Sequence, residues 1–138
     1  MRVMVLVKAT PESEANYMPT EEELSEMTAF NEELVKAGVM LDGEGLHPSA
    51  NSARVSWSGG EVTVTDGPFT EAKELVAGYW VWQVRSLDEA KEWAKRIPNL
   101  GRDGAVELRP IFEADDFGEA YTPEIRQRED EIRRQTAK

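Results

Sequence analysis

The sequence predicts an α+β domain of ferredoxin-like type, an antiparallel sheet with two helices on one face. Two segments, 1–8 and 76–84, carry apolar residues on both faces and have the character of central strands. Each of them is followed by an amphipathic segment that opens with a helix-capping sequence. The predicted order is therefore strand, helix, strand, hairpin, strand, helix and strand.

The first helix is predicted to begin after Thr20. Thr20 and Glu23 have the spacing of a capping box, in which a hydroxyl and a carboxylate satisfy free backbone N–H groups. Apolar residues follow at helical spacing, and Gly38 stands where a left-handed residue commonly ends a helix. We expect this helix to pack on the sheet.

The second helix and the last strand follow the same logic. Ser86 and Glu89 form a second predicted capping box, and Pro98 stops the helix. The segment 106–111 reads as the closing strand, and Pro110 favours a position at the sheet edge because it cannot donate a hydrogen bond.

Between these units the pattern predicts a loop and a hairpin. The segment 42–48 is expected to be irregular because it contains two glycines and a proline. Segments 53–57 and 61–65 alternate between apolar and polar residues and are joined by a Ser-Gly-Gly turn. The hairpin delivers the chain to Asp66.

The sheet needs a cover on both faces, and two helices cover only one. Trp80 and Trp82 are expected in core or dimer packing. A bare apolar sheet face is unusual on a soluble monomer, so we expect a homodimer through the open sheet face. We place the ferredoxin-like domain at residues 1–113 and a charged helical extension at 114–138, lying at the periphery or on the partner subunit.

Composition narrows the classes of partner. The chain of 138 residues has 16 basic and 27 acidic side chains, a net charge of -11, so we expect no nucleic-acid or anionic-membrane binding. The absence of cysteine excludes disulfides and thiolate chemistry. The apolar run at the start is too short to span a bilayer, and we expect a cytoplasmic protein.

The corner at 66–74 joins a constrained turn to a cluster of charges. We expect Gly67 to adopt backbone angles that the following proline makes awkward for other residues. Lys73 and Glu74 are expected in a single helical turn beside it. A purely structural role of this corner is one of the hypotheses for it.

Several motifs occur in a fixed order along the chain: segments 43–48 and 64–69, Glu71 with segment 73–74, segments 78–79 and 86–90, and Trp93, Ala94 and Pro98. Together they resemble the DGPF-containing branch of the YCII-related family, from Met1 to about Phe112. The resemblance implies a dimeric α+β barrel, in which two ferredoxin-like subunits face their sheets together. Proteins of this barrel type include small-molecule isomerases, lyases, dehydrochlorinases and monooxygenases.

Two functions follow from this resemblance. The first is a small-molecule isomerase or lyase with a His/Asp acid–base pair, since the related YCII branch carries such a pair as its active site. The alternative is a non-catalytic ligand-binding or regulatory dimer linked to a sigma factor, because DGPF-type members often stand beside sigma factors of the extracytoplasmic-function class.

His47 and Asp66 are the catalytic candidates. His47 is the only histidine, and a carboxylate that orients an imidazole prepares it for general acid–base work near neutral pH. The competing interpretation is turn chemistry, in which both side chains bond to local backbone groups.

Four further residues are candidates for substrate binding: Phe69, Lys73, Glu74 and Tyr79. Lys73 would contact an anion, and the aromatic rings would line an apolar cavity. A local ion pair of Lys73 with Glu74 is the simpler alternative. No metal is expected, because one histidine with scattered carboxylates makes no spaced ligand set. No cofactor is expected either, since no phosphate-binding glycine motif is present.

Overall fold

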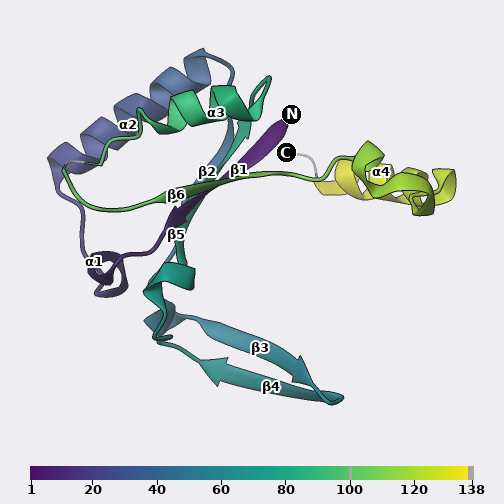
Figure 1. The fold of residues 1–138 in the computed structure, drawn as a ribbon, viewed down its shortest axis with the longest axis horizontal. Coiled ribbons are helices and arrows are strands. Elements are labelled where there is room, and N and C mark those ends of the chain that lie inside the picture. The colour runs from purple at the N-terminus through teal and green to yellow at the C-terminus, as the bar shows by residue number, and fades with distance from the viewer. Residues whose placement is uncertain (100, 137–138) are drawn as a thin grey trace.

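The computed structural model describes residues 1–99 and 101–136 and has the predicted α+β architecture. One antiparallel sheet has the strand order β2-β5-β1-β6, and the helices α2 and α3 cover one of its faces (Figure 1). The strands of this sheet are β1 (Arg2–Lys8), β2 (Met40–Gly45), β5 (Val76–Gln83) and β6 (Val106–Pro110).

The remaining elements surround this sandwich of sheet and helices. They are the helices α1 (Pro11–Glu14), α2 (Glu21–Lys36), α3 (Leu87–Ala94) and α4 (Pro123–Thr136), the strands β3 (Ala53–Ser58) and β4 (Glu61–Asp66), and the 3-10 turns η1 (Ser49–Asn51), η2 (Ala72–Glu74) and η3 (Ala114–Ala120). The fold class predicted from the sequence is confirmed.

Helix α2 begins and ends where the sequence predicts. The Thr20 hydroxyl accepts a hydrogen bond from the Glu23 N–H at 3.1 Å, and the Glu23 carboxylate accepts one from the Thr20 N–H at 3.3 Å. Gly38 follows the last turn at a φ of 72°, in the left-handed region that favours glycine.

The capping box predicted for α3 forms only in half. Ser86 accepts from the Glu89 N–H at 3.1 Å. The Glu89 carboxylate binds Arg85 instead of the cap residue, through the Arg85 backbone N–H at 2.9 Å and its guanidinium. Arg85 competes successfully because a bidentate charged donor binds a carboxylate more strongly than one neutral N–H does.

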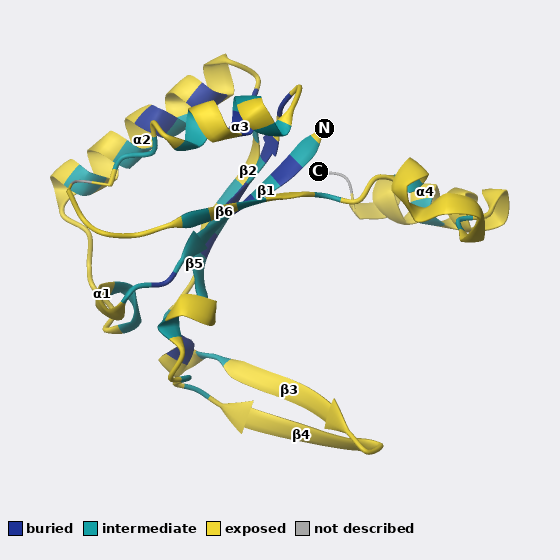
Figure 2. Ribbon diagram, in the orientation of Figure 1, coloured by how far each residue is buried: buried dark blue, intermediate teal, exposed yellow. Residues whose placement is uncertain are grey.

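The core lies between the helices and the sheet. Val3, Val5, Trp80 and Trp82 present one face of the central strands to α2 and α3, and the edge of Phe30 meets the Trp80 ring at a centroid distance of 6.1 Å. Both tryptophans therefore belong to this core. The opposite sheet face carries the pairs Met4–Val81 and Leu6–Tyr79, and no helix of the described chain covers it (Figure 2).

Strand β2 overturns the loop expected at 42–48, because its residues as far as Gly45 pair with β5. Gly43 is required here by a close approach. A Cβ at Gly43 would lie 2.9 Å from Cδ1 of Trp80 and 3.0 Å from Cε of Met40. Glycine inside this strand thus marks a tight contact with the core tryptophan.

The chain leaves the sheet at two places. The β3–β4 hairpin projects below the sheet and α4 lies beyond the end of β6 (Figure 1). The helix predicted within the extension 114–138 is found as α4, and the last two residues of that extension lie outside the described residues. None of the helices in the described ranges is long and apolar enough to cross a bilayer.

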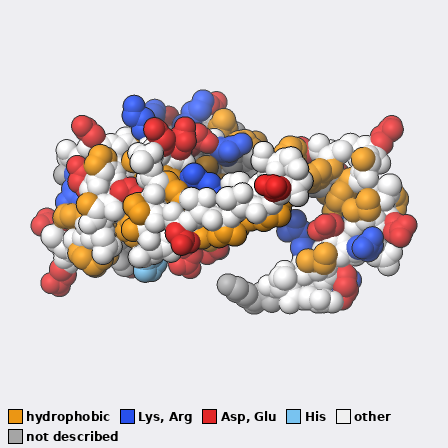
Figure 3. All heavy atoms as spheres, turned by 90° about the horizontal axis from the view of Figure 1, so that it is seen from below, with side chains coloured by type: hydrophobic (Ala, Val, Ile, Leu, Met, Phe, Trp, Pro, Cys, Tyr) orange, Lys and Arg blue, Asp and Glu red, His pale blue; other side chains and the backbone are white. Residues whose placement is uncertain are grey.

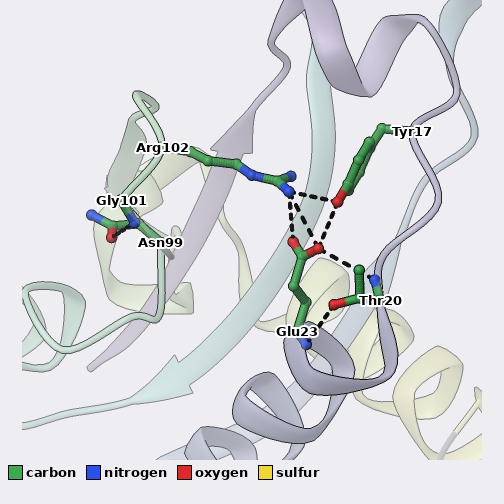
Figure 4. Close-up of polar contacts among 6 residues, drawn as sticks. All are labelled: Tyr17, Thr20, Glu23, Asn99, Gly101 and Arg102. Atoms are coloured by element: carbon green, nitrogen blue, oxygen red, sulfur yellow. Dashed lines mark hydrogen bonds and ion pairs between the residues drawn. The ribbon is translucent and has the colours of Figure 1, made fainter.

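A cluster of polar side chains ties the segment before α2 to the loop before β6 (Figure 4). The Arg102 guanidinium donates to Oη of Tyr17 at 2.5 Å and contacts the Glu23 carboxylate at 3.1 Å. Tyr17 in turn donates to Glu23 at 2.6 Å. This hydrogen bond, more than the nearby arginine, holds the pKa of Glu23 below its ordinary value of 4.5.

Replacing Glu23 by Gln is expected to make the protein less sensitive to acid. A carboxylate whose pKa is lowered by folding stabilises the folded state above its ordinary pKa of 4.5 and loses that contribution as the pH falls further. We expect Glu23→Gln to have a lower Tm at about pH 7 and a shallower fall in Tm toward about pH 3. Glu22→Gln, one residue away and outside the cluster, should have the same dependence of Tm on pH as the wild type. If the Tm of Glu23→Gln falls with pH as steeply as that of the wild type, the Glu23 carboxylate does not have this stabilising role.

Candidate functional site

The corner after β4 is held by backbone contacts with η1. The Gly67 N–H donates to the Ser52 carbonyl at 2.8 Å. A Cβ at Gly67 would lie 1.7 Å from the Ser49 carbonyl oxygen, so only glycine fits. Gly67 does not have a positive φ. The close approach of another backbone segment is what requires glycine here. The backbone angles expected for a residue before proline stay a prediction.

Ser49 lies at the centre of this corner and is the buried polar residue of the described chain. Its hydroxyl donates to the Glu14 carboxylate and accepts from the Phe69 N–H at 3.0 Å. Its backbone N–H also donates to Glu14, at 3.0 Å. Three segments distant in sequence, namely α1, η1 and the turn after β4, are thus joined through one side chain.

His47 and Phe69 line the same open cavity of about 540 Å³, at the junction of the sheet and the hairpin. Glu14, Ser49 and Arg54 also line it, and the rest of the wall is largely apolar: Leu46, Ser52, Ala53, Val55, Leu75 and Val76. The cavity thus combines apolar walls with polar and charged side chains and has room for a small molecule.

The imidazole of His47 is held by an amide. Nδ1 of His47 lies 3.0 Å from Nδ2 of Asn51, which belongs to η1. Nε2 has no hydrogen-bond partner among the described residues. The ring is exposed, so Nε2 is available to a ligand.

Arg54 supplies the positive charge of the cavity. Its guanidinium carbon lies 3.9 Å from the centroid of the Phe69 ring, a cation–π contact. None of the ion pairs in the described residues includes Arg54. The stacked guanidinium therefore keeps its donors for water or for an anionic ligand.

The other predicted site residues lie elsewhere. Asp66 ends β4 opposite Ala53 and makes no hydrogen bond or ion pair with His47. Lys73 and Glu74 lie in the single turn η2, exposed and outside this cavity, without an ion pair between them. The single helical turn expected for them is confirmed, and the expected local ion pair is absent from this part of the structure.

Tyr79 lines a different cavity, of about 300 Å³, together with Asn31 and Trp80. Nε1 of Trp80 donates to Oδ1 of Asn31 at 2.9 Å there. The negative charge of Asp42 raises the pKa of Tyr79, with partial burial and then Glu44 adding to the effect. The phenol therefore keeps its proton at neutral pH.

Three residues of the larger cavity were not predicted: Glu14, Ser49 and Arg54. Glu14 and Ser49 are 35 positions apart, so no spacing rule connects them. Arg54 follows the polar alternation of a strand and carries no motif. A signal was present only for Ser49, which immediately follows the His-Pro pair of the family-like segment.

The family model of the YCII-related domain matches residues 1–115 of the chain. The chain belongs to the YCII-related family. An uncharacterized protein of Rhizobium meliloti (strain 1021) is 34% identical to this YCII-related protein over 89 residues, which cover 64% of this chain and 72% of that relative. The family predicted from the sequence motifs is confirmed at this level, and the DGPF branch stays a prediction.

One solved structure similar to this YCII-related protein is a 5-chloro-2-hydroxyhydroquinone dehydrochlorinase from Burkholderia phenoliruptrix, in complex with 2,5-dihydroxybenzoquinone. The TM-score is 0.48 at 16% identity, and the match covers 84% of this chain and 98% of that chain. Within residues 1–99 and 101–136, no group of three or more His, Asp or Glu side chains is arranged to hold a metal ion.

Proposed function

We propose that this YCII-related protein binds a small organic anion in the cavity beside His47 and isomerises or cleaves it by acid–base chemistry. The observation that carries the proposal is that His47 and Arg54, an acid–base group and an unpaired cation, line one cavity of about 540 Å³. Its apolar walls suit a carbon skeleton, and its size suits a compact carboxylate or phenolate.

Arg54 binds the anionic group of the substrate in this proposal. Its planar guanidinium offers paired N–H donors to a carboxylate while its face stays on Phe69 at 3.9 Å. This contact limits the orientations of the arginine side chain. Arg54 takes the role of anion contact that the sequence suggested for Lys73, because Lys73 lies outside the cavity.

His47 exchanges the proton. Nε2 takes a proton from a carbon next to a carbonyl group of the substrate. The electron pair of that C–H bond forms a carbon–carbon double bond to the carbonyl carbon, and the π pair of the C=O bond moves onto its oxygen. In an isomerisation the proton returns to another carbon; in a lyase reaction the electron pair expels a leaving group from the adjacent carbon. Asn51, whose Nδ2 lies 3.0 Å from Nδ1, orients the ring, a role that the sequence suggested for Asp66. An amide N–H only donates, so the Nε2 lone pair that this step requires is present when the Asn51 amide turns over and its oxygen accepts from Nδ1–H.

A specific observation favours a second candidate function, binding without turnover. No carboxylate in the described residues hydrogen-bonds to His47, and the nearest partner is the neutral amide of Asn51. An imidazole without a carboxylate partner is a weaker base than one in a His/Asp pair. The same cavity would then serve a ligand-binding or regulatory dimer.

The homodimer through the open sheet face is a part of this proposal. The pairs Met4–Val81 and Leu6–Tyr79 place four partly buried apolar or aromatic side chains on that face. A second copy that contributes the same surface would cover all of them by a two-fold axis.

Exchange of single cavity residues tests the enzymatic proposal. With a panel of small hydroxylated and aromatic carboxylic acids, we expect Arg54→Gln to raise Kd by at least about tenfold, because it removes a charge-assisted hydrogen bond of about 1.5–3 kcal/mol. We expect His47→Gln to abolish turnover while Kd changes by less than about threefold. Binding is followed by ligand-detected NMR and turnover by product analysis.

Lys73→Gln is the matched control, since it removes a positive charge outside the cavity, and it should leave both quantities unchanged. Turnover that survives in His47→Gln would overturn the acid–base role. Ligand binding by the wild type without turnover of any acid in the panel would favour the binding-only function.

A further inference from the structure

The β3–β4 hairpin stands apart from the rest of the fold. Its strands pair only with each other, and all residues of both strands are exposed (Figure 2). A two-stranded hairpin without a supporting surface is only marginally stable in water. The hairpin therefore needs a cover that the single chain does not provide in its described residues.

One face of the hairpin is apolar. The register pairs Val55 with Val64 and Trp57 with Val62, so these four side chains lie on the same face. Their exposed fractions are 45%, 65%, 74% and 61%, respectively. The opposite face pairs Ser56 with Thr63 and is polar. A row of hydrophobic side chains crosses the middle of the molecule when it is viewed from the hairpin side (Figure 3).

The hairpin extends on the same side of the sheet as the open face. The hairpin and α4 both extend on the side of the sheet that faces away from α2 and α3 (Figure 1). A molecule seated on the open face would therefore lie next to the hairpin.

We infer that the β3–β4 hairpin is an arm that packs its apolar face, Val55, Trp57, Val62 and Val64, on a second copy of this chain. This inference rests on the homodimer proposed above and adds a second contact to it. In a two-fold dimer the arm of each subunit reaches the other, so the contact occurs twice.

Interface area favours a second copy as the occupant. A stable interface buries roughly 800 Å² on each partner, so a dimer through the open face gains from further apolar surface beside it. The hairpin adds several hundred Å² of apolar surface, in the range of the largest patches on ordinary monomers. The net charge of -11 disfavours nucleic acid and anionic membranes.

The arm also connects the dimer with the proposed ligand site. Val55 lies on the apolar face of the hairpin and also lines the cavity of His47 and Arg54. A second copy that covers Val55 would narrow the opening of this cavity.

Fluorine NMR of the full chain labelled with 5-fluorotryptophan tests the arm. The chain has four tryptophans, and Trp57→Phe identifies the resonance of Trp57. We expect the Trp57 resonance to shift and to lose its H₂O/D₂O solvent isotope effect over the concentrations at which sedimentation velocity shows the dimer forming. A dimer in which Trp57 keeps its full isotope effect would overturn the arm and leave the proposed dimer intact.

Matched variants measure the contribution of the arm. Trp57→Ser is expected to raise the dimer Kd by at least about tenfold, as the loss of a buried aromatic anchor typically does, while Thr63→Ala on the polar face leaves it unchanged. Far-UV circular dichroism checks that each variant is folded. An unchanged Kd for Trp57→Ser contradicts the arm.

Val81→Glu separates the two proposals, since it places a charge on the open face without touching the hairpin. It is expected to abolish the dimer. A wild-type protein that stays monomeric at every concentration would overturn both the arm and the dimer. A dimer that persists in Val81→Glu but is weakened in Trp57→Ser would support the arm and overturn the open-face contact.

Discussion

Gly67→Ala is expected to lower the free energy of unfolding by about 3 kcal/mol, the upper end of the range for an overpacked site. The added Cβ would lie 1.7 Å from the Ser49 carbonyl oxygen, and both groups belong to backbone that cannot move independently. The turn must shift, and the hydrogen bond from the Gly67 N–H to Ser52 is lost with it. Thermal unfolding should show a Tm roughly 10 °C lower.

Gly45→Ala is the control for Gly67→Ala. Gly45 lies at the end of β2, and no atom lies within 4 Å of the position of its Cβ. We expect its Tm to stay within a few degrees of the wild type. If Gly67→Ala has a wild-type Tm, and the Phe69 amide keeps its protection from hydrogen exchange, then the close approach of the two backbone segments does not exist in solution.

Leu34→Ala is expected to destabilise the protein by about 3 kcal/mol through the loss of buried methyl groups and the cavity left behind. Leu34 is 0% exposed and packs in the core between α2 and the sheet. Helix propensity works in the opposite direction, since alanine is the better helix former, but that gain is only a few tenths of a kcal/mol. Urea unfolding gives the free energy directly.

Val35→Ala tests whether burial is the cause. Val35 is the next residue on the same helix and is 61% exposed. Its replacement should change the free energy of unfolding by less than about 0.5 kcal/mol. Equal effects of Leu34→Ala and Val35→Ala would show that α2 packs through a different face.

The fold was largely predictable because its local signals agree with one another. Thr20 and Glu23 start α2, Gly38 follows its end, and Pro110 lies on an edge strand, as expected from caps and from the missing proline N–H. The exception at 42–45 is instructive. Gly43 was read as a sign of irregular structure, whereas it makes room for the Trp80 ring in a regular strand.

The candidate site was predictable only in part. His47 and Phe69 were both named as site residues from the sequence, and both line one cavity. Asp66 and Lys73 are close to this region in sequence but lie outside that cavity. Sequence distance is a poor guide here because the direction of a side chain alternates along a strand and turns at each corner.

Local rules therefore determine the secondary structure, the core helix face, the apolar hairpin face and the family of this protein from the sequence alone. These features depend on neighbours within a few residues or on a repeating period. Tertiary structure alone decides that Ser49 joins Glu14 to Phe69 and that Arg54 lines the same cavity as His47. Such contacts join segments that meet only when the sheet has formed, and no residue spacing encodes them.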